Sequence, residues 1–366
     1  MQEQGERGAF EFYGSWREYA PIAFTNLLLT IVTLGVYNFW GRARTRRYLW
    51  SQTRFIDDRL EWTGTGRELM LGYVVVMALV FAPVAGLNLL IGALAMRGTS
   101  SGAAAAGLLF LLLYLFLFML GGVAIFRALR YRLSRTFWHG IRGGSDDQGF
   151  RYGLSYMWRT MLGSFAFGLL VPWALVSLWN KRWNAMSFGP YPFRAGANTD
   201  GLMGRYLLFY LVPIVLLIAA IAFAVVATLG AHRQPGEAAI GMPTSFGFLL
   251  AFAAFYLVFF VVMGLIALYF YSAYFRQVIA GLTLGNLEFG FTARTRDWLT
   301  FMLGNIALVV CTLGIGSIFL SYRSWAFFVR HIEAYGSLDL DQFTQSTTRA
   351  PGQGEGLFDS LDMGAF

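Results

Sequence analysis

Residues 98–126 read GTSSGAAAAGLLFLLLYLFLFMLGGVAIF, without a single Asp, Glu, Lys or Arg. About 20 consecutive apolar residues are enough for a helix to cross the hydrocarbon core of a bilayer. Three other long stretches, 69–96, 206–231 and 238–275, are equally free of charge. These four segments predict an α-helical integral membrane protein with four long transmembrane helices.

The composition of the whole chain agrees with a membrane location. Of its 366 residues, 57% are hydrophobic and 13% are charged, whereas soluble domains carry about 25% charged residues. The polar stretch 1–16 lacks the basic start and apolar core of a cleavable signal peptide, so insertion is expected to begin at internal helices. Cys311 is the only cysteine and there are three histidines; the sequence therefore predicts no disulfide, no metal site and no cofactor.

Three shorter apolar stretches, 21–40, 160–179 and 299–320, are related by an internal repeat. A shift of 279 residues pairs Phe10, Phe12, Asn26, Thr33, Leu34, Gly35 and Arg44 with Phe289, Phe291, Asn305, Thr312, Leu313, Gly314 and Arg323. The middle copy is weaker, with Leu169 and Leu170 taken to replace the Leu-Gly pair. The sequence predicts repeats at 1–130, 131–280 and 281–336, followed by an acidic, Gly-rich, disordered tail at 337–366.

Two topologies are open for the shorter segments, which are either re-entrant or spanning. If all seven segments span the bilayer, 10 of the 28 basic residues face outward. If the three shorter segments enter and leave on the cytoplasmic side, only Arg97 and Arg233 do. Because cytoplasmic loops are enriched in basic residues, we expect four spans, three re-entrant segments and both termini in the cytoplasm. The alternative is that Thr-Leu-Gly only permits close helix packing.

Short stretches of alternating character, 9–14, 54–63, 184–194 and 281–292, predict small cytoplasmic β elements. Two helix starts are also legible, because Ser15 with Glu18 and Thr65 with Glu68 have the spacing of a capping box. In that arrangement side chains satisfy the first exposed amides of a helix.

Several motifs at the head of the first repeat resemble the YjgN-like family of bacterial polytopic inner-membrane proteins. They are Phe12–Ser15, Asn26–Thr30, Thr33–Tyr37, Trp40, Arg42–Tyr48 and Thr53–Phe55, with a later segment at Arg132–Gly140. The resemblance covers nearly the whole chain before the tail. It implies a multi-pass protein of the bacterial inner membrane, and it supplies no catalytic residue, because the family has no established activity.

Polar residues within the shorter segments are the candidates for a solute path. They are Asn26, Thr30, Thr33, Gly35, Asn38, Asn305, Thr312 and Gly314. The long segments contain no ionisable residue of the kind that marks proton relays. These polar groups suit hydrogen bonding to a neutral or anionic solute, and the alternative is that they satisfy one another.

Arginines that follow the apolar segments are the candidates for contact with anionic lipid. They are Arg42, Arg44, Arg46, Arg47 and Arg323, and a second cluster, Arg127, Arg130, Arg132 and Arg135, has the same character. Guanidinium groups beside aromatic residues suit anionic headgroups, and the simpler alternative is a topology anchor. The net charge of +8 is explained by the same orientation rule, so no nucleic-acid partner is expected.

The sequence shows no convincing Ser-His-Asp set or phosphate-binding glycine loop. Its carboxylate pairs, Asp57-Asp58 and Asp146-Asp147, are adjacent residues, which usually point apart, and no enzyme is predicted. The leading hypothesis is a channel- or transporter-like protein of unknown solute, built from repeated units and completed by a homo-oligomer. The alternative is a non-transporting, membrane-organising or anionic-lipid-binding protein. Both have the lipid bilayer, with anionic phospholipids, as partner.

Overall fold

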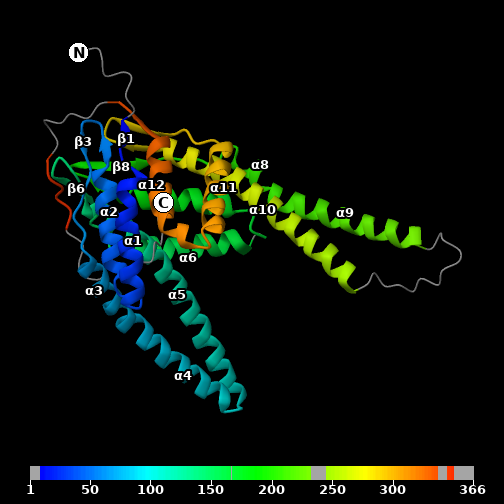
Figure 1. The fold of residues 1–366 in the computed structure, drawn as a ribbon. Helices are drawn as coiled ribbons and strands as arrows, with labels where there is room; N and C mark the ends of the chain where they lie inside the picture. The colour runs from blue at the N-terminus through cyan, green and yellow to red at the C-terminus, as the bar shows by residue number, and fades with distance from the viewer. Residues whose placement is uncertain (1–8, 166, 232–244, 337–343, 350–366) are drawn as a thin grey trace. The chain divides into compact units, whose positions relative to one another are not determined.

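The computed structural model describes residues 9–165, 167–231, 245–336 and 344–349, which are mostly helical (Figure 1). The chain divides into two compact units. The first comprises residues 1–198, 277–292 and 301–366, and the second comprises residues 199–276 and 293–300. These units are defined by contacts between residues, whereas the predicted repeats are defined by sequence similarity. The repeat boundaries therefore stay a prediction.

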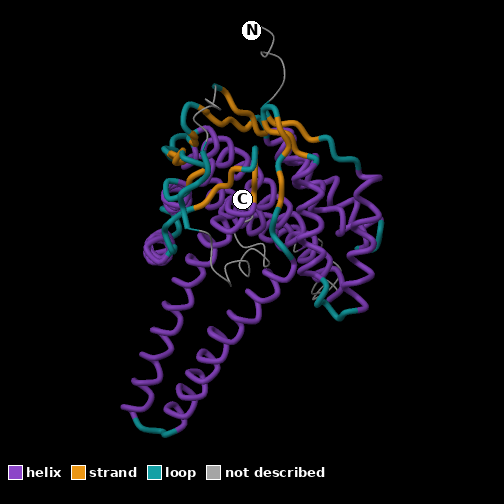
Figure 2. The backbone as a smooth tube through the Cα atoms, turned by 90° about the vertical axis from the view of Figure 1, so that its left-hand side faces the viewer, coloured by secondary structure: helices purple, strands orange, loops and turns teal. Residues whose placement is uncertain are grey.

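A long helical pair extends from the first unit. It begins with α3 (Gly66–Val76), continues without a break through a π-helical turn, η1 (Met77–Phe81), into α4 (Ala82–Met96), and returns as α5 (Ser100–Arg135). Figure 2 shows α4 and α5 running side by side away from the strands. The predicted start at Gly66 is confirmed, since the Thr65 hydroxyl accepts a hydrogen bond from the Glu68 amide.

The second unit contains α8 (Leu202–Tyr206), α9 (Leu208–Ala231), most of α10 (Ser245–Ala280) and the first turns of α11 (Thr295–Cys311). Within the described residues of the whole chain, three helices are long and apolar enough to cross a membrane: Ser100–Arg135, Leu202–Ala222 and Phe252–Ala280. They fall in three of the four predicted segments. The fourth, 69–96, is helical, but η1 interrupts it and its α4 part has 15 residues; the count of four spans stays a prediction.

Each shorter apolar segment folds as a helical hairpin. Hairpin 1 consists of α1 (Trp16–Val32) and α2 (Asn38–Ser51), and hairpin 2 consists of α6 (Phe150–Phe165) and α7 (Val171–Trp183). Hairpin 3 consists of α11, a 3-10 turn η2 (Ile315–Phe319) and α12 (Leu320–His331). The predicted start of α1 after Ser15 is confirmed, with the Ser15 hydroxyl accepting from the Arg17 amide.

The β elements of the first unit form two antiparallel sheets rather than isolated pieces. A three-stranded sheet has the order β1-β2-β3, and an eight-stranded sheet has the order β11-β10-β9-β8-β7-β6-β5-β4. Their bounds are β1 (Phe10–Phe12), β2 (Thr53–Phe55), β3 (Asp58–Arg59), β4 (Glu61–Trp62), β5 (Thr136–Trp138), β6 (Ile141–Gly144), β7 (Ser187–Phe188), β8 (Tyr191–Ala195), β9 (Leu282–Leu284), β10 (Leu287–Phe291) and β11 (Ile332–Tyr335).

The sequence located the regions of β1 to β4 and β7 to β10, but it missed β5, β6 and β11 and the joining of eight strands into one sheet. The reason is that these strands have two to five residues and pair across long sequence separations, such as Glu61 with Phe137 and Phe193 with Leu284. Local alternation carries no information on such pairing.

An aromatic core joins hairpin 1 to the long helices. Trp50 of α2 stacks on Trp325 of α12 with ring centroids 4.0 Å apart, and it meets Trp62 of β4 at 5.0 Å. Tyr131 of α5 donates a hydrogen bond to Glu68 at the start of α3. This core fixes α2, α3, α5 and α12 against one another.

The short described part of the predicted tail is packed. Residues 344–349 lie against β6, where the Arg142 guanidinium donates to the Thr348 carbonyl and the Arg349 amide donates to Asp146 Oδ1 at 3.0 Å. The remainder of the predicted disordered tail, 337–343 and 350–366, lies outside the described residues.

Candidate functional site

The three hairpins turn with the same backbone geometry. Each turn contains a bulky residue and then a glycine, both with positive φ: Leu34 (50°) and Gly35 (95°), Phe167 (51°) and Gly168 (78°), and Leu313 (51°) and Gly314 (93°). The middle copy therefore turns at Phe167-Gly168, and the alignment of Leu169 and Leu170 with Leu-Gly was wrong. Phenylalanine in the leucine position hid the match.

Thr33 and Thr312 connect the two halves of their hairpins. The Thr33 hydroxyl donates to the Leu29 carbonyl at 2.7 Å and accepts from the Tyr37 amide at 2.9 Å. The Thr312 hydroxyl makes the equivalent pair of bonds, to the Leu308 carbonyl and from the Gly316 amide, both at 2.6 Å. Both threonines, like Gly35 and Gly314, belong to the turns, and they are not among the described residues that line the cavity below.

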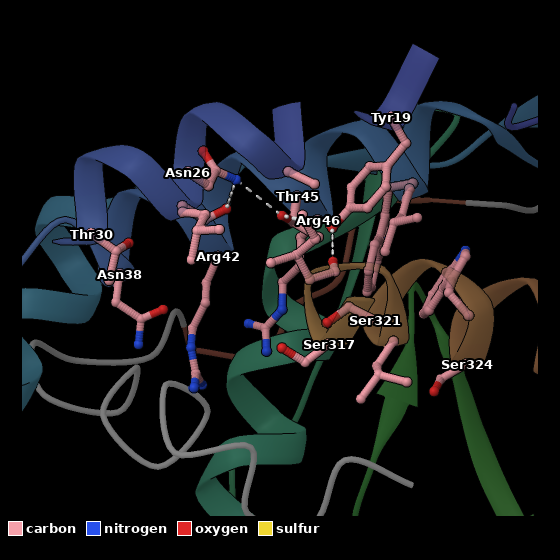
Figure 3. Close-up of a pocket in the computed structure, with 18 of the residues that line it drawn as sticks. Tyr19, Asn26, Thr30, Asn38, Arg42, Thr45, Arg46, Ser317, Ser321 and Ser324 are labelled. Atoms are coloured by element: carbon pink, nitrogen blue, oxygen red, sulfur yellow. Dashed lines mark hydrogen bonds between the residues drawn. The ribbon is translucent and has the colours of Figure 1, made fainter. Parts of the chain in front are cut away.

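A cavity of about 570 Å³ lies between hairpin 1, the end of α5 and the second half of hairpin 3 (Figure 3). The first unit contributes all of its lining residues. They are Tyr19, Ala23, Asn26, Leu27, Thr30, Asn38, Gly41, Arg42, Thr45, Arg46, Leu49, Trp50, Arg132, Ser317, Ile318, Leu320, Ser321, Ser324 and Trp325.

The two long walls of this cavity are built from positions that the shift of 279 residues pairs with one another. Five residues of α2 that line it correspond, at the constant shift of 279, to five lining residues of η2 and α12. The pairs are Asn38 with Ser317, Gly41 with Leu320, Arg42 with Ser321, Thr45 with Ser324, and Arg46 with Trp325. The same faces of two related helices therefore meet across the cavity, although the chemistry of the two faces differs.

The lining is cationic and rich in hydroxyl groups. Three guanidinium groups, those of Arg42, Arg46 and Arg132, belong to the lining, and none of its described residues is a carboxylate. Six hydroxyl-bearing side chains complete it: Tyr19, Thr30, Thr45, Ser317, Ser321 and Ser324. Figure 3 shows the side chains of Arg42 and Arg46 extending from the same side of α2. The Arg46 guanidinium also lies 5.1 Å from the centroid of the Trp62 ring, a cation–π distance.

Asn26 and Tyr19 hold the α1 side of the cavity in place. The Asn26 amide donates to the Gly41 carbonyl at 3.1 Å and to Thr45 Oγ1 at 3.3 Å. The Tyr19 hydroxyl donates to the Ile318 carbonyl at 3.3 Å, which links hairpin 1 to hairpin 3. Burial raises the pKa of Tyr19, opposed by its hydrogen bond with Thr45, so this phenol stays a neutral group at neutral pH.

Tyr48 of α2 contacts the first turn of α1 and is not among the described lining residues. Its hydroxyl donates to the Ser15 carbonyl at 3.0 Å and lies 3.3 Å from Glu18 Oε2. Burial raises the pKa of Tyr48 to about 12; the hydrogen bond to Ser15 opposes this rise, and the Glu18 carboxylate adds to it.

The structure brings together part of the predicted site. Of the solute-path candidates, Asn26, Thr30 and Asn38 line the cavity, whereas Asn305 accepts a hydrogen bond from Arg323 Nε at 2.6 Å outside it. Of the lipid candidates, Arg42 and Arg46 line the cavity, and Arg44 and Arg47 are exposed elsewhere on α2.

The sequence missed Tyr19, Thr45 and the serines of hairpin 3 as lining residues. The shift of 279 could have found those serines, since it carries Arg42 to Ser321 and Thr45 to Ser324.

The chain matches a family described as bacterial protein of unknown function (DUF898) over residues 7–360. It belongs to this family. Over 74 residues it is 32% identical to the inner membrane protein YjgN of Escherichia coli O157:H7, and 31% identical to that of strain K12. Each match covers 20% of this chain and 19% of the relative, so the chain aligns with about a fifth of these curated relatives. No solved structure matches this DUF898 protein.

Proposed function

We propose that this protein is a multi-pass protein of the bacterial inner membrane that binds a phosphate-bearing anion, the headgroup of an anionic phospholipid, in the cavity between hairpins 1 and 3. The observation that carries the proposal is a lining with three guanidinium groups and six hydroxyl groups, in which no residue that the structure describes is a carboxylate. The family and the names of its relatives support the membrane location. The proposal assigns no reaction and no cofactor to the cavity.

The chemistry of the lining favours phosphate over other ligands. The planar guanidinium group donates two parallel hydrogen bonds to phosphate oxygens, and hydroxyl groups donate to the remaining oxygens. A cavity of about 570 Å³ is within the size range of about 300–1,000 Å³ that is usual for small-molecule sites. Arg132 stands near the cytoplasmic end of the apolar helix α5, at the depth where phospholipid headgroups lie if α5 spans the bilayer.

The proposed topology has four spans, α3 to α4, α5, α9 and α10, with three hairpins entering and leaving on the cytoplasmic side. It is supported by the distribution of basic residues, because only Arg97 and Arg233 then face outward. A cysteine at Asn198 in a Cys311→Ser background tests it. Labelling by a membrane-impermeant thiol reagent only after lysis of spheroplasts is expected, and labelling of intact spheroplasts would contradict the topology.

The ligand is tested by calorimetric titration of the purified protein in uncharged detergent. The probes are short-chain phosphatidylglycerol, phosphatidylcholine of the same chain length, glycerol phosphate and inorganic phosphate. We expect binding of phosphatidylglycerol that Arg42→Ser weakens. Arg44→Ser should leave it unchanged, because Arg44 lies only two residues, or about 3 Å of helix rise, farther along α2 but outside the cavity. Equal binding of phosphatidylcholine would contradict the proposal, and binding of free phosphate alone would replace the lipid by a soluble anion.

A second function, transport of an anionic solute by a channel- or transporter-like mechanism, is favoured by one observation. Asn26, Thr30 and Asn38 line the same cavity as the arginines, between two hairpins of an internal repeat, and transporters place their sites between repeats. Flux of phosphate or glycerol phosphate into proteoliposomes, lost in Arg42→Ser, would favour transport. Saturable lipid binding without flux would favour the lipid-binding function.

A further inference from the structure

The tips of the three hairpins combine an unfavourable backbone conformation with nearly complete exposure of an apolar side chain. Leu34, Phe167 and Leu313 have φ near 50° and are 94%, 88% and 95% exposed. The left-handed conformation costs a residue with a Cβ about 1–2 kcal/mol. The side chains of Leu34 and Leu313 regain almost nothing from packing within the described chain, because almost their whole surface is exposed.

The turn itself does not require these residue types. Gly35 donates to the Thr30 carbonyl at 2.8 Å and Leu34 to the Ile31 carbonyl at 3.1 Å, which is the bonding of a Schellman motif with Leu34 as the left-handed residue. Glycine or asparagine is the usual residue at that position. Leucine, phenylalanine and leucine in three independent turns therefore point to an apolar environment outside the protein.

Hairpin 1 places its tip beside the long helix that starts at Gly66. Trp40 lies against Gly66, and the ring of Phe39 lies 5.4 Å from that of Tyr73. Tyr73 is seven residues along the helix, or about 10 Å from its start. Leu34 lies in the turn that precedes α2, on the side of Phe39 away from the rest of that helix. The tip is therefore at least as deep as Tyr73 when the helix that starts at Gly66 enters a bilayer.

Hairpin 2 follows α5 in the same way. The ring of Tyr152 lies 5.5 Å from that of Phe126, and the ring of Tyr156 lies 5.4 Å from that of Phe118. α6 therefore runs along α5 away from the arginines that follow Phe126 and towards its apolar middle. Phe167 lies beyond that contact, at the far end of α6.

Charges on the returning helices limit how deep the tips can go. Arg44 is exposed on α2, six residues or about 9 Å of helix beyond its start at Asn38, and the turn that contains Leu34 precedes that start. Arg323 follows Leu313 by ten residues, as Arg44 follows Leu34. With these guanidinium groups at headgroup level, the tips reach roughly a third to a half of a hydrocarbon core of about 30 Å.

We propose that the three tips are wedges that insert Leu34, Phe167 and Leu313 among the acyl chains of the cytoplasmic leaflet and end within it. The wedges deepen, and rest on, the re-entrant placement proposed above, and they do not depend on what the cavity binds. Apolar neighbours enlarge the first and third wedges: Val32, Val36 and Ile315 are all exposed.

The depth of a spin label tests the wedges in full-length protein reconstituted into vesicles of phosphatidylglycerol and phosphatidylcholine. In the Cys311→Ser background, labels are placed by Leu34→Cys, by Val36→Cys, which avoids the strained position, and by Arg47→Cys as the control on α2. Collision with dissolved oxygen reports acyl chains, and collision with a water-soluble nickel chelate reports water.

We expect an oxygen-to-nickel collision ratio several-fold higher at positions 34 and 36 than at 47. A nickel collision rate at position 34 equal to that at 47 would overturn the wedge, and so would shielding from both reagents, because the tip would then be packed on protein or a second copy. The Asn198→Cys labelling tests the topology separately from the exposure of the tips to lipid. If the tips are exposed to lipid but Asn198→Cys is labelled in intact spheroplasts, the hairpins do not end within the cytoplasmic leaflet. Loss of headgroup binding in Arg42→Ser is independent of either result.

A second variant separates the wedge from a folding role. Leu34→Asn keeps a residue that tolerates the left-handed conformation and removes the apolar side chain. The melting temperature in detergent is expected to be unchanged or higher, while collision of a Val36→Cys label in this variant with the water-soluble nickel chelate becomes more frequent. A large drop in melting temperature with an unchanged nickel collision rate would overturn the wedge, because Leu34 would then serve the fold.

Discussion

Hairpins 1 and 3 have the same turn, the same threonine bridge and the same face on the cavity, yet the two faces carry different chemistry. Arg42 and Arg46 on α2 correspond to Ser321 and Trp325 on η2 and α12. Four arginines facing one another would repel across the cavity. With cations on one wall and a hydroxyl and an indole on the other, the cavity presents one charged wall to an anion and neutral donors opposite.

The asparagine that the two hairpins share also has two different partners. Asn26 donates to the Gly41 carbonyl, whereas Asn305 accepts from Arg323. Glycine at position 304 explains the difference, because a Cβ there would lie 2.6 Å from an Arg323 guanidinium nitrogen. Hairpin 1 has Thr25 at the equivalent position. This threonine leaves no such space for Arg44, which lies exposed on α2 instead.

The largest effect is expected when the arginine of one cavity wall is moved to the equivalent position of the other. Arg42→Ser removes a charge-assisted hydrogen bond to the ligand, about 1.5–3 kcal/mol, and should weaken phosphatidylglycerol binding by roughly 10- to 100-fold. Adding Ser321→Arg in the same chain moves the cation to the opposite wall and should restore most of that loss. Calorimetric titration measures both. No recovery in the double variant would show that the two walls are not interchangeable.

Gly304→Thr gives hairpin 3 the residue of hairpin 1 and should destabilise it by about 1–3 kcal/mol through overpacking against Arg323. The melting temperature of the purified protein in detergent measures the effect. Gly121→Thr, in α5, is the matched control, because a Cβ at Gly121 meets no atom within 4 Å. Equal shifts in the two variants would contradict the space argument.

The sequence predicted the long helices and the helix starts at Trp16 and Gly66. It also singled out five residues that line the cavity, three as solute-path candidates and two as lipid candidates. It did so because apolar length, caps and short polar repeats are local properties. The rest depends on distant contacts. Arg132 was only one of four clustered arginines, and its place in the cavity depends on how the end of α5 packs against α2, through Trp62 and Tyr131.

Removing the threonine bridge should affect both hairpins equally. Thr33→Val and Thr312→Val keep the shape of the side chain and remove the hydroxyl that joins the two halves of each turn. A net loss of about 1 kcal/mol each is expected, seen as similar drops in melting temperature and roughly additive in the double variant because the turns share no contact. A lower melting temperature in only one of the two variants would show that the hydroxyl group stabilises the two turns unequally, despite their common geometry.

The smallest expected effect is a difference at alkaline pH. Position 327, equivalent to Tyr48, is phenylalanine, so of hairpins 1 and 3 only hairpin 1 has a phenol at this position.

The pKa of Tyr48 is raised to about 12, above the ordinary value near 10. The folded protein therefore keeps this phenol protonated where the unfolded chain ionises it, and the associated stability is complete below pH 10 and is lost as pH rises towards 12. Tyr48→Phe should lower the melting temperature modestly at pH 8, through the lost bond to Ser15, and should show a smaller further drop at pH 11 than the parent. An unchanged alkaline drop would assign the pH sensitivity to the other tyrosines whose pKa burial raises, such as Tyr19 and Tyr322.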